Sequence, residues 1–243
     1  MAPIAYERFD LEKYVDFDTY LKDWMHINLY TQMRGANRFE ALVNMLVHIH
    51  YPAEKMSHLK HWVENAEQLS MTSLREEMGR VGSQTDLQAA LDWSQACNDG
   101  IHTYESEDYA AFSGVHEALA EIAEHGPIYV VSTANKPNIS REWRENQIDE
   151  FVTEYRCQEA GPKRVTLAHF VEEGYGKENI IMIGDSPGDL KAAEQNGVHF
   201  YPILVGQETQ SWQTFTADVL PAFMRGEMNQ DTYTQLFKNH LSQ

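Results

Sequence analysis

The stretch GDSPGD at residues 184–189 carries two carboxylates four residues apart, Asp185 and Asp189, directly after an apolar run. A carboxylate at the end of a buried strand is costly unless a cation or hydrogen-bond donors compensate its charge, and two neighbouring carboxylates repel each other. Mg²⁺ resolves both problems, because it binds carboxylate oxygens and keeps positions for water and phosphate. The pair therefore indicates a magnesium site. In the alternative interpretation, Asp185 is a turn residue and Asp189 only caps the next helix.

Three more polar side chains follow apolar runs of the same kind. Ser132 and Thr133 come after the run at 128–131, and Lys163 lies in the loop after the run at 151–157. Each is weak evidence alone, because hydroxyls often form turns and a loop lysine is usually solvated. Hydroxyls, an ammonium and paired carboxylates together supply the positioning and charge neutralisation that phosphoryl transfer needs. Their common position favours a site for a phosphoryl group and its metal.

The elements that position these residues are predicted from an alternation of strand and helix patterns that begins near residue 110. Strand-like apolar runs alternate with helical patterns, and Gly197 is a candidate left-handed stop for one of the helices. The strands are expected at 128–131, 151–157, 180–183 and 199–204, and the helices at 115–123, 141–147, 165–173 and 190–196. This order predicts one parallel sheet covered on both faces, with a ligand site at the carboxyl ends of its strands.

The first half of the chain shows helical periodicity without a strand pattern. Apolar residues fall on one helical face at 39–47, at 59–69 and at 87–91. We therefore predict three parts: an N-terminal segment at 1–25 that begins the core in an atypical or truncated form, a helical subdomain at 26–108, and an α/β core with C-terminal helices at 109–243.

Composition and charge exclude several classes of protein. The 243 residues include 19 Lys and Arg against 37 Asp and Glu, a net charge of −18, which disfavours nucleic acid and anionic membranes as partners. The first 20 residues lack the pattern of a signal peptide, and the longest apolar stretch, at 41–51, is too short to span a bilayer. Cys97 and Cys157 are far apart and match no zinc or disulfide pattern. A cytoplasmic location is expected.

Three segments resemble motifs of the haloacid dehalogenase superfamily. YVVSTANK, GPKRVTLAHF and IIMIGDSPGDLKAAEQNG look like its second, third and fourth motifs, over residues 110–205. The helical segment that contains INLYTQMRGANRF is similar to the helical cap that some members insert after their first motif. The resemblance implies a Rossmann-like α/β core with an inserted α-helical cap subdomain.

The resemblance also implies an activity and a role for each motif residue. Ser132, with Thr133, would bind the transferring phosphoryl group, and Lys163 would stabilise its charge and orient the nucleophile. Asp185 would ligate Mg²⁺, and Asp189 would support the metal site. The implied function is a magnesium-dependent phosphatase that hydrolyses a small phosphate ester through an aspartyl-phosphate, with the cap controlling access.

The sequence departs from the family pattern at the first motif, an apolar strand that ends in Asp-x-Asp. The only such pair is Asp16 and Asp18 in EKYVDFDTY, which is a poor sequence for a buried strand. The alternative for this pair is a solvated acidic helix or loop. Three explanations remain open: residues 1–20 form an atypical strand, the neighbouring strands close up, or upstream residues are missing. The corresponding alternative function is an inactive or truncated protein that binds Mg²⁺ and a phosphorylated ligand without turnover.

Two arginines of the cap-like segment are further candidates. Arg34 and Arg38 flank Gly35 and would be able to reach an anionic substrate from the cap. Surface or ion-paired arginines are commoner, so a structural role is the alternative for both.

Overall fold

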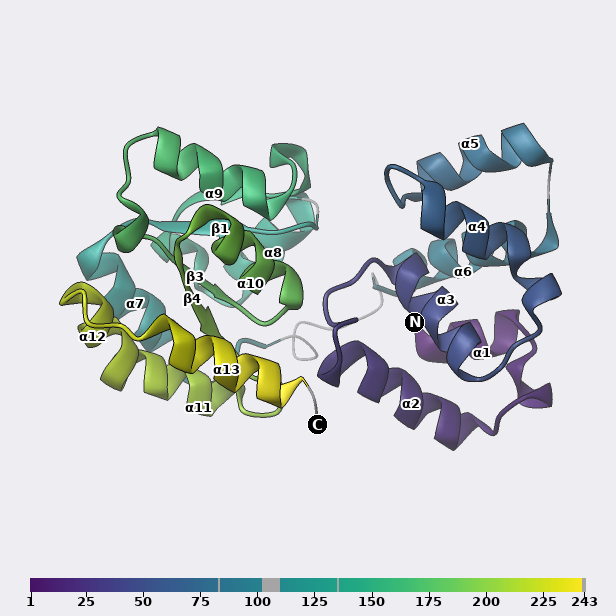
Figure 1. The fold of residues 1–243 in the computed structure, drawn as a ribbon, viewed down its shortest axis with the longest axis horizontal. Helices are drawn as coiled ribbons and strands as arrows, with labels where there is room; N and C mark the ends of the chain where they lie inside the picture. Colours follow the sequence, from purple (N-terminus) through teal and green to yellow (C-terminus); the bar gives the residue numbers. More distant parts are fainter. Residues whose placement is uncertain (83, 102–109, 135, 242–243) are drawn as a thin grey trace. The chain divides into compact units, whose positions relative to one another are not determined.

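The computed structural model describes residues 1–82, 84–101, 110–134 and 136–241, with the side chain of residue 101 left out. The chain divides into two compact units, Met1–Tyr104 and Glu105–Gln243. We call them the helical unit and the α/β unit (Figure 1). Every helix in the described ranges is too short or too polar to cross a bilayer.

The helical unit is built from amphipathic helices around an aromatic core. Its elements are α1 (Ala2–Arg8), η1 (Leu11–Lys13), α2 (Phe17–Tyr30), α3 (Arg38–His48), η2 (Ala53–Lys55), α4 (Ser57–Asn65), α5 (Met71–Val81) and α6 (Thr85–Ile101). Tyr20, Phe39 and Trp93 are almost fully buried at its centre. Residues 1–25 belong to this unit: they fold into α1, η1 and the start of α2, and the Trp93 indole N–H donates to the Met1 carbonyl at 3.2 Å.

Local capping signals set several helix starts in this unit. Asn37 and Glu40 form a capping box at α3, and Ser70 caps α5. The start of α4 is capped from another helix instead, because the buried Asp86 of α6 accepts the backbone N–H groups of His58 and Leu59, both at 2.9 Å.

The α/β unit alternates strands and helices as predicted. Its strands are β1 (Ile128–Val131), β2 (Val152–Arg156), β3 (Ile181–Gly184) and β4 (His199–Pro202). Its α-helices are α7 (Val115–His125), α8 (Lys136–Glu145), α9 (Lys163–Glu172), α10 (Pro187–Asn196), α11 (Glu208–Thr214), α12 (Leu220–Met224) and α13 (Gln230–His240). The shorter elements are η4 (Asp149–Phe151), η5 (Gln158–Ala160), η6 (Lys177–Asn179) and the π-helical turn η7 (Phe215–Val219). Gly197 ends α10 in the left-handed conformation at φ 66°, which confirms that prediction.

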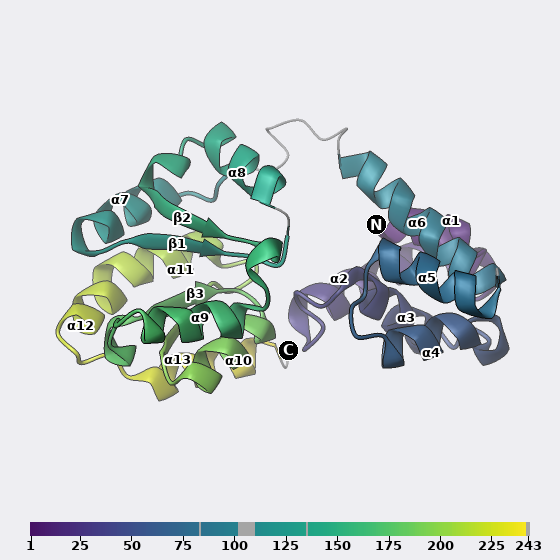
Figure 2. The same cartoon turned by 90° about the horizontal axis from the view of Figure 1, so that it is seen from above.

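Apolar side chains pack on both faces of the strands, which gives three layers. One cluster joins Leu167 and Phe170 of α9 to Met182, Phe200 and Phe237. The opposite side is covered by clusters from α7, α11 and η7, with Tyr201, Phe215 and Leu119 among their members. Figure 2 shows the strands between the helices of this unit.

The prediction of one continuous four-stranded sheet is wrong. β1 pairs in parallel with β2, and β3 pairs in parallel with β4, but no ladder joins β1 to β3 in the described residues. Figure 2 shows β3 lying apart from the β1/β2 pair. Two of the three explanations for the missing first motif are therefore contradicted, because residues 1–20 contain helices instead of a strand and because the neighbouring strands have not closed up.

Candidate functional site at the strand ends

An ion pair joins the first turns of the helices that follow β2 and β3. Lys163 is the first residue of α9, and its Nζ lies 2.5 Å from Oδ1 of Asp189, which is the third residue of α10. The Asp189 side chain is only 2% exposed and that of Lys163 is 21% exposed. Because this contact links the residues that follow two strands from different pairs, the carboxyl ends of both pairs lie at the same edge of the unit.

The second oxygen of Asp189 is held within its own helix start. Asp189 Oδ2 accepts from the Ser186 hydroxyl at 2.8 Å and from the Ser186 backbone N–H at 3.1 Å. Ser186 Oγ accepts in turn from the Asp189 N–H at 3.3 Å, which completes a capping box. With Lys163 on one oxygen and Ser186 on the other, Asp189 is oriented by donors on both sides.

Gly184 is required by the position of this carboxylate. A β-carbon on Gly184 would lie 2.7 Å from Asp189 Cβ and closer still to its carboxyl carbon. The backbone of β3 thus passes directly against the Asp189 side chain. Asp189 is therefore the group that requires a glycine at this position.

Asp185 differs from Asp189 in its surroundings. It follows β3 directly and is exposed, at the N-terminal side of α10. Among the residues that the structure describes, no three His, Cys, Asp or Glu side chains are grouped as a metal site. Mg²⁺ is commonly held by only one or two carboxylates with waters and substrate phosphates, so an exposed Asp185 at this position fits the ion. Asp189 fits less well as a direct ligand, because both of its oxygens already accept hydrogen bonds.

The hydroxyls after β1 form a turn. The Ser132 N–H donates to the Arg156 carbonyl at 3.1 Å, which extends the β1/β2 pairing, and Ser132 Oγ accepts from the Ala134 N–H at 3.1 Å. Thr133 is exposed. The turn-forming alternative is therefore present for Ser132, but accepting at Oγ leaves the hydroxyl proton available to a phosphate oxygen.

The structure brings Lys163 and Asp189 together and keeps the other predicted residues at separate strand ends. Ser132 and Thr133 follow β1, whereas Asp185 follows β3. Lys163 therefore follows a strand of the β1/β2 pair, and the exposed Asp185 follows a strand of the β3/β4 pair.

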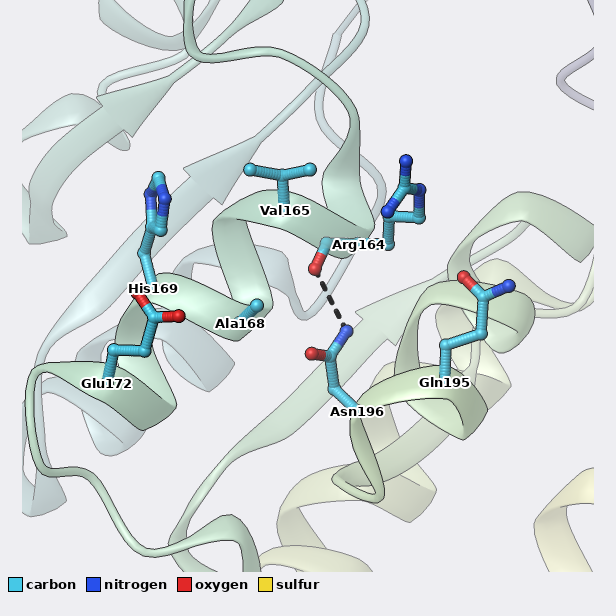
Figure 3. Close-up of a pocket in the computed structure, with 7 residues that line it drawn as sticks. All are labelled: Arg164, Val165, Ala168, His169, Glu172, Gln195 and Asn196. Carbon is cyan, nitrogen blue, oxygen red and sulfur yellow. Dashed lines mark hydrogen bonds between the residues drawn. The ribbon is translucent and has the colours of Figure 1, made fainter.

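A surface hollow between α9 and α10 lies outside this constellation (Figure 3). Arg164, Val165, Ala168, His169 and Glu172 line it from α9, and Gln195 and Asn196 line it from α10. The Asn196 amide donates to the Arg164 carbonyl at 3.0 Å and bridges the two helices. None of the predicted site residues lines this hollow.

A comparison with protein families then decides the family. The model described as "Haloacid dehalogenase-like hydrolase" matches residues 36–203, which is more than half of the chain. The chain belongs to this family. The comparisons found no match among curated proteins or solved structures.

Residues 1–35 lie outside the matched range of this haloacid dehalogenase-like hydrolase, and they include the only Asp-x-Asp pair. Asp16 caps α2: its Oδ1 accepts from the Thr19 N–H at 3.0 Å, and this hydrogen bond lowers the pKa of the carboxyl. Asp18 lies in the first turn of the same helix. The solvated acidic helix that was weighed as the alternative is what the structure contains.

The arginines of this haloacid dehalogenase-like hydrolase have structural contacts. Arg38 Nη1 donates to Asn98 Oδ1 at 2.7 Å and to the Ser94 carbonyl at 3.2 Å, which ties α3 to α6. Arg34 Nη1 lies 3.5 Å from the Leu29 carbonyl. Arg38 therefore has a structural role, which was the alternative interpretation for both arginines.

Ser186 is a member of the site that was not predicted from the sequence. Its role was readable, because a serine followed three residues later by an acidic residue at a helix start is a capping-box pattern.

Proposed function

We propose that this haloacid dehalogenase-like hydrolase binds a small phosphate ester and Mg²⁺ at the strand ends and acts as a phosphatase. The single observation that carries the proposal is the Lys163–Asp189 ion pair. It holds the Lys163 ammonium at the edge of the unit where Ser132 follows β1 and Asp185 follows β3.

Lys163 is proposed to bind the phosphoryl group. Its ammonium has three donors, and the contact with Asp189 occupies one of them. The remaining donors, with the hydroxyl proton of Ser132 and the exposed Thr133, are suited to phosphoryl oxygens. Asp189 is then a positioning residue, because it acts through Lys163.

Asp185 is proposed as the protein's magnesium ligand. The ion, when bound, neutralises charge that develops on the phosphoryl oxygens. Asp185 is exposed at the end of β3, so it is accessible to a hydrated ion and to a substrate phosphate. The net charge of −18 agrees with a small substrate in preference to a polyanion.

The helical unit is proposed as a cap that controls access to the site. The match of the chain to the family model begins at residue 36, so the matched range contains α3 to α6 of the helical unit together with the strands of the α/β unit. A cytoplasmic setting is also proposed, because both cysteines are buried free thiols.

A second candidate function is binding of Mg²⁺ and a phosphorylated ligand without turnover. It is favoured by a specific observation: hydrolysis through an aspartyl-phosphate needs a carboxylate nucleophile, and Asp16 is engaged as a helix cap in the helical unit. The two functions share the same binding residues and differ only in turnover.

The test measures binding and turnover side by side. Calorimetry with Mg²⁺ and with inorganic phosphate reports binding, and release of phosphate from an aryl phosphate with and without Mg²⁺ reports turnover. Asp185→Asn is compared with Asp231→Asn, because Asp231 is also exposed near a helix start, that of α13.

Magnesium-dependent turnover that is lost in Asp185→Asn and kept in Asp231→Asn supports the phosphatase. Binding without turnover supports the second candidate. A fully active Asp185→Asn protein contradicts the assignment of the metal site, and a folded chain that binds neither Mg²⁺ nor phosphate contradicts both functions.

A further inference from the structure

The outer face of α9 carries a cation near one end and an anion near the other. Arg164 and Glu172 are both exposed and lie eight residues apart, which is about 12 Å along the helix axis. In the part of the chain that the structure describes, neither the Arg164 guanidinium nor the Glu172 carboxylate has an ion-pair or hydrogen-bond partner. The separation along the helix also prevents the two from pairing with each other.

Arg164 differs in this respect from the other arginines of the α/β unit. Each of those has a carboxylate within 4.0 Å: Arg141 pairs with Glu145, Arg144 with Asp149, Arg156 with Glu154, and Arg225 with Glu227. The chain has 37 acidic residues against 19 basic ones, so most of its cations have a carboxylate available. An unpaired guanidinium in such a chain indicates a position that accommodates an anionic group from another molecule.

The surface between the two charges is small and apolar. Ala168 lies four residues from each of them, and Ala168 and Val165 are partly buried. With Asn196 they line the hollow between α9 and α10, which has a volume of about 340 Å³ (Figure 3). Side chains four residues apart form a ridge on a helix. The ridge of Arg164, Ala168 and Glu172 therefore has long charged side chains at its ends and a methyl group at its centre.

This ridge is complementary to a second copy of itself. In a two-fold symmetric contact, residue i of one copy meets residue j of the other, and j meets i. A two-fold axis beside Ala168 brings Arg164 of each copy to Glu172 of the other, and it brings the two Ala168 side chains together. Ridges of this kind interdigitate when the helices cross at about 50°, which is the commonest class of helix packing. The opposite orientation of the ridges would place like charges together, which costs affinity.

We propose that this face of α9 is a homodimer interface and that its partner is a second copy of this chain. The two Arg164–Glu172 pairs fix the register of the helices, and the small Ala168 side chain lets them approach each other closely. The hollow beside the ridge accommodates side chains of the second copy. Association does not require the proposed phosphatase activity, because Ser132, Asp185 and Asp189 do not line this hollow.

The oligomeric state of the full chain tests the proposal. Analytical ultracentrifugation over a range of concentrations is expected to show an equilibrium between a monomer of 28.0 kDa and a dimer of twice that mass. Arg164→Glu or Glu172→Arg places like charges at both contacts and is expected to weaken dimerisation at least about tenfold. Arg141→Glu is the control, because it reverses an exposed charge on α8 and should leave dimerisation unchanged.

Mixing the two charge-reversed chains separates a specific contact from a general loss of association. The Arg164→Glu chain has two carboxylates on its ridge, and the Glu172→Arg chain has two cations. Each chain alone repels its own copy, whereas a heterodimer of the two restores both pairs. The mixture is therefore expected to dimerise at concentrations where each variant alone is a monomer. Circular dichroism checks that both variants are folded.

A disulfide tests the position of the two-fold axis. Ala168→Cys places a thiol where the same residue of the second copy meets it, so oxidation is expected to cross-link the dimer. Glu172→Cys is the control, because position 172 meets position 164 and not itself. The chain's own thiols, Cys97 and Cys157, are buried and do not compete.

Three results would overturn the proposal: a monomer at every concentration, a dimer that neither charge reversal weakens, or folded variants that associate no better in the mixture than alone. If a charge-reversed chain does not fold, the cross-linking comparison decides, and equal cross-linking of Ala168→Cys and Glu172→Cys then contradicts the interface. Phosphate release has no bearing on any of these outcomes.

Discussion

Lys163 and Asp189, 26 residues apart in sequence, form an ion pair with Nζ and Oδ1 separated by 2.5 Å, and this contact links the starts of α9 and α10. It gives a family motif residue a structural task as well as a proposed catalytic one.

Removing the lysine from this pair is expected to destabilise the fold. Lys163→Met leaves the buried Asp189 carboxylate without its cation, which costs about 1–3 kcal/mol of unfolding free energy, at the low end for a lysine that is partly exposed. Urea unfolding measures the change. The matched control is Lys238→Met, because Lys238 pairs with Glu194 at 3.5 Å with both side chains about half exposed, and a change of less than about 1 kcal/mol is expected there. Equal effects of the two variants would contradict the structural role.

Adding a methyl group to β3 is expected to displace the Asp189 carboxylate. Gly184→Ala places its β-carbon 2.7 Å from Asp189 Cβ, so the fold should lose about 1–3 kcal/mol and phosphate affinity should fall. Gly126→Ala is the control, since a β-carbon there meets nothing within 4 Å and its φ of 177° is extended. Unfolding curves and phosphate titrations of both variants decide the matter; a Gly184→Ala protein with wild-type stability and affinity would refute this packing.

Asp16 is expected to behave as a helix cap. Asp16→Asn keeps an acceptor for the Thr19 N–H and should leave stability and any turnover unchanged, whereas Asp16→Ala should lower the unfolding free energy because the acceptor is lost. Thermal unfolding and phosphate release measure the two effects. The outcome against a cap is a stable Asp16→Asn protein whose magnesium-dependent turnover has disappeared, because that would make Asp16 the nucleophile.

Arg38 is expected to stabilise the helical unit. Arg38→Met removes hydrogen bonds to Ser94 and Asn98 and should cost about 1–3 kcal/mol, because the acceptors on α6 lose a charged donor. Arg75→Met on α5 is the control, since Arg75 is exposed, and it should change stability by less than about 0.5 kcal/mol. An Arg38→Met protein that keeps its stability but loses substrate affinity would show a binding role instead.

Alkaline pH is expected to weaken the fold through the buried thiols. Burial raises the pKa of Cys97 and Cys157, so the unfolded thiols ionise at a lower pH than the folded ones. Stability is then fully present below the ordinary thiol pKa of about 8.5 and is lost as pH rises from there through the raised folded values. Urea unfolding between pH 7 and 10 measures the slope. Cys157→Ala should reduce it; an identical slope in that variant would show that the thiol has no part in the effect.

Local patterns in the sequence determined most of the elements. The apolar run at 128–131 is β1, and the start of α10 follows from a serine cap with an acidic residue three positions later. The stop at Gly197 was also readable. These features depend on neighbouring residues along the chain, because a helix cap or a strand period involves only near positions. The net charge and the strand-end polar residues were equally open to sequence analysis.

Tertiary structure decided which of these groups meet. Asp189 forms an ion pair with Lys163, and Arg38 forms hydrogen bonds with α6. Residues 1–25 fold into helices, and the expected sheet consists of two separate strand pairs, β1/β2 and β3/β4. Pairing between strands and between distant charges depends on every other element that competes for the same partners, and no local pattern contains that information. The sequence therefore determined which residues stand at the strand ends, and only the fold decided which of them lie in contact, because such contacts depend on neighbours in space.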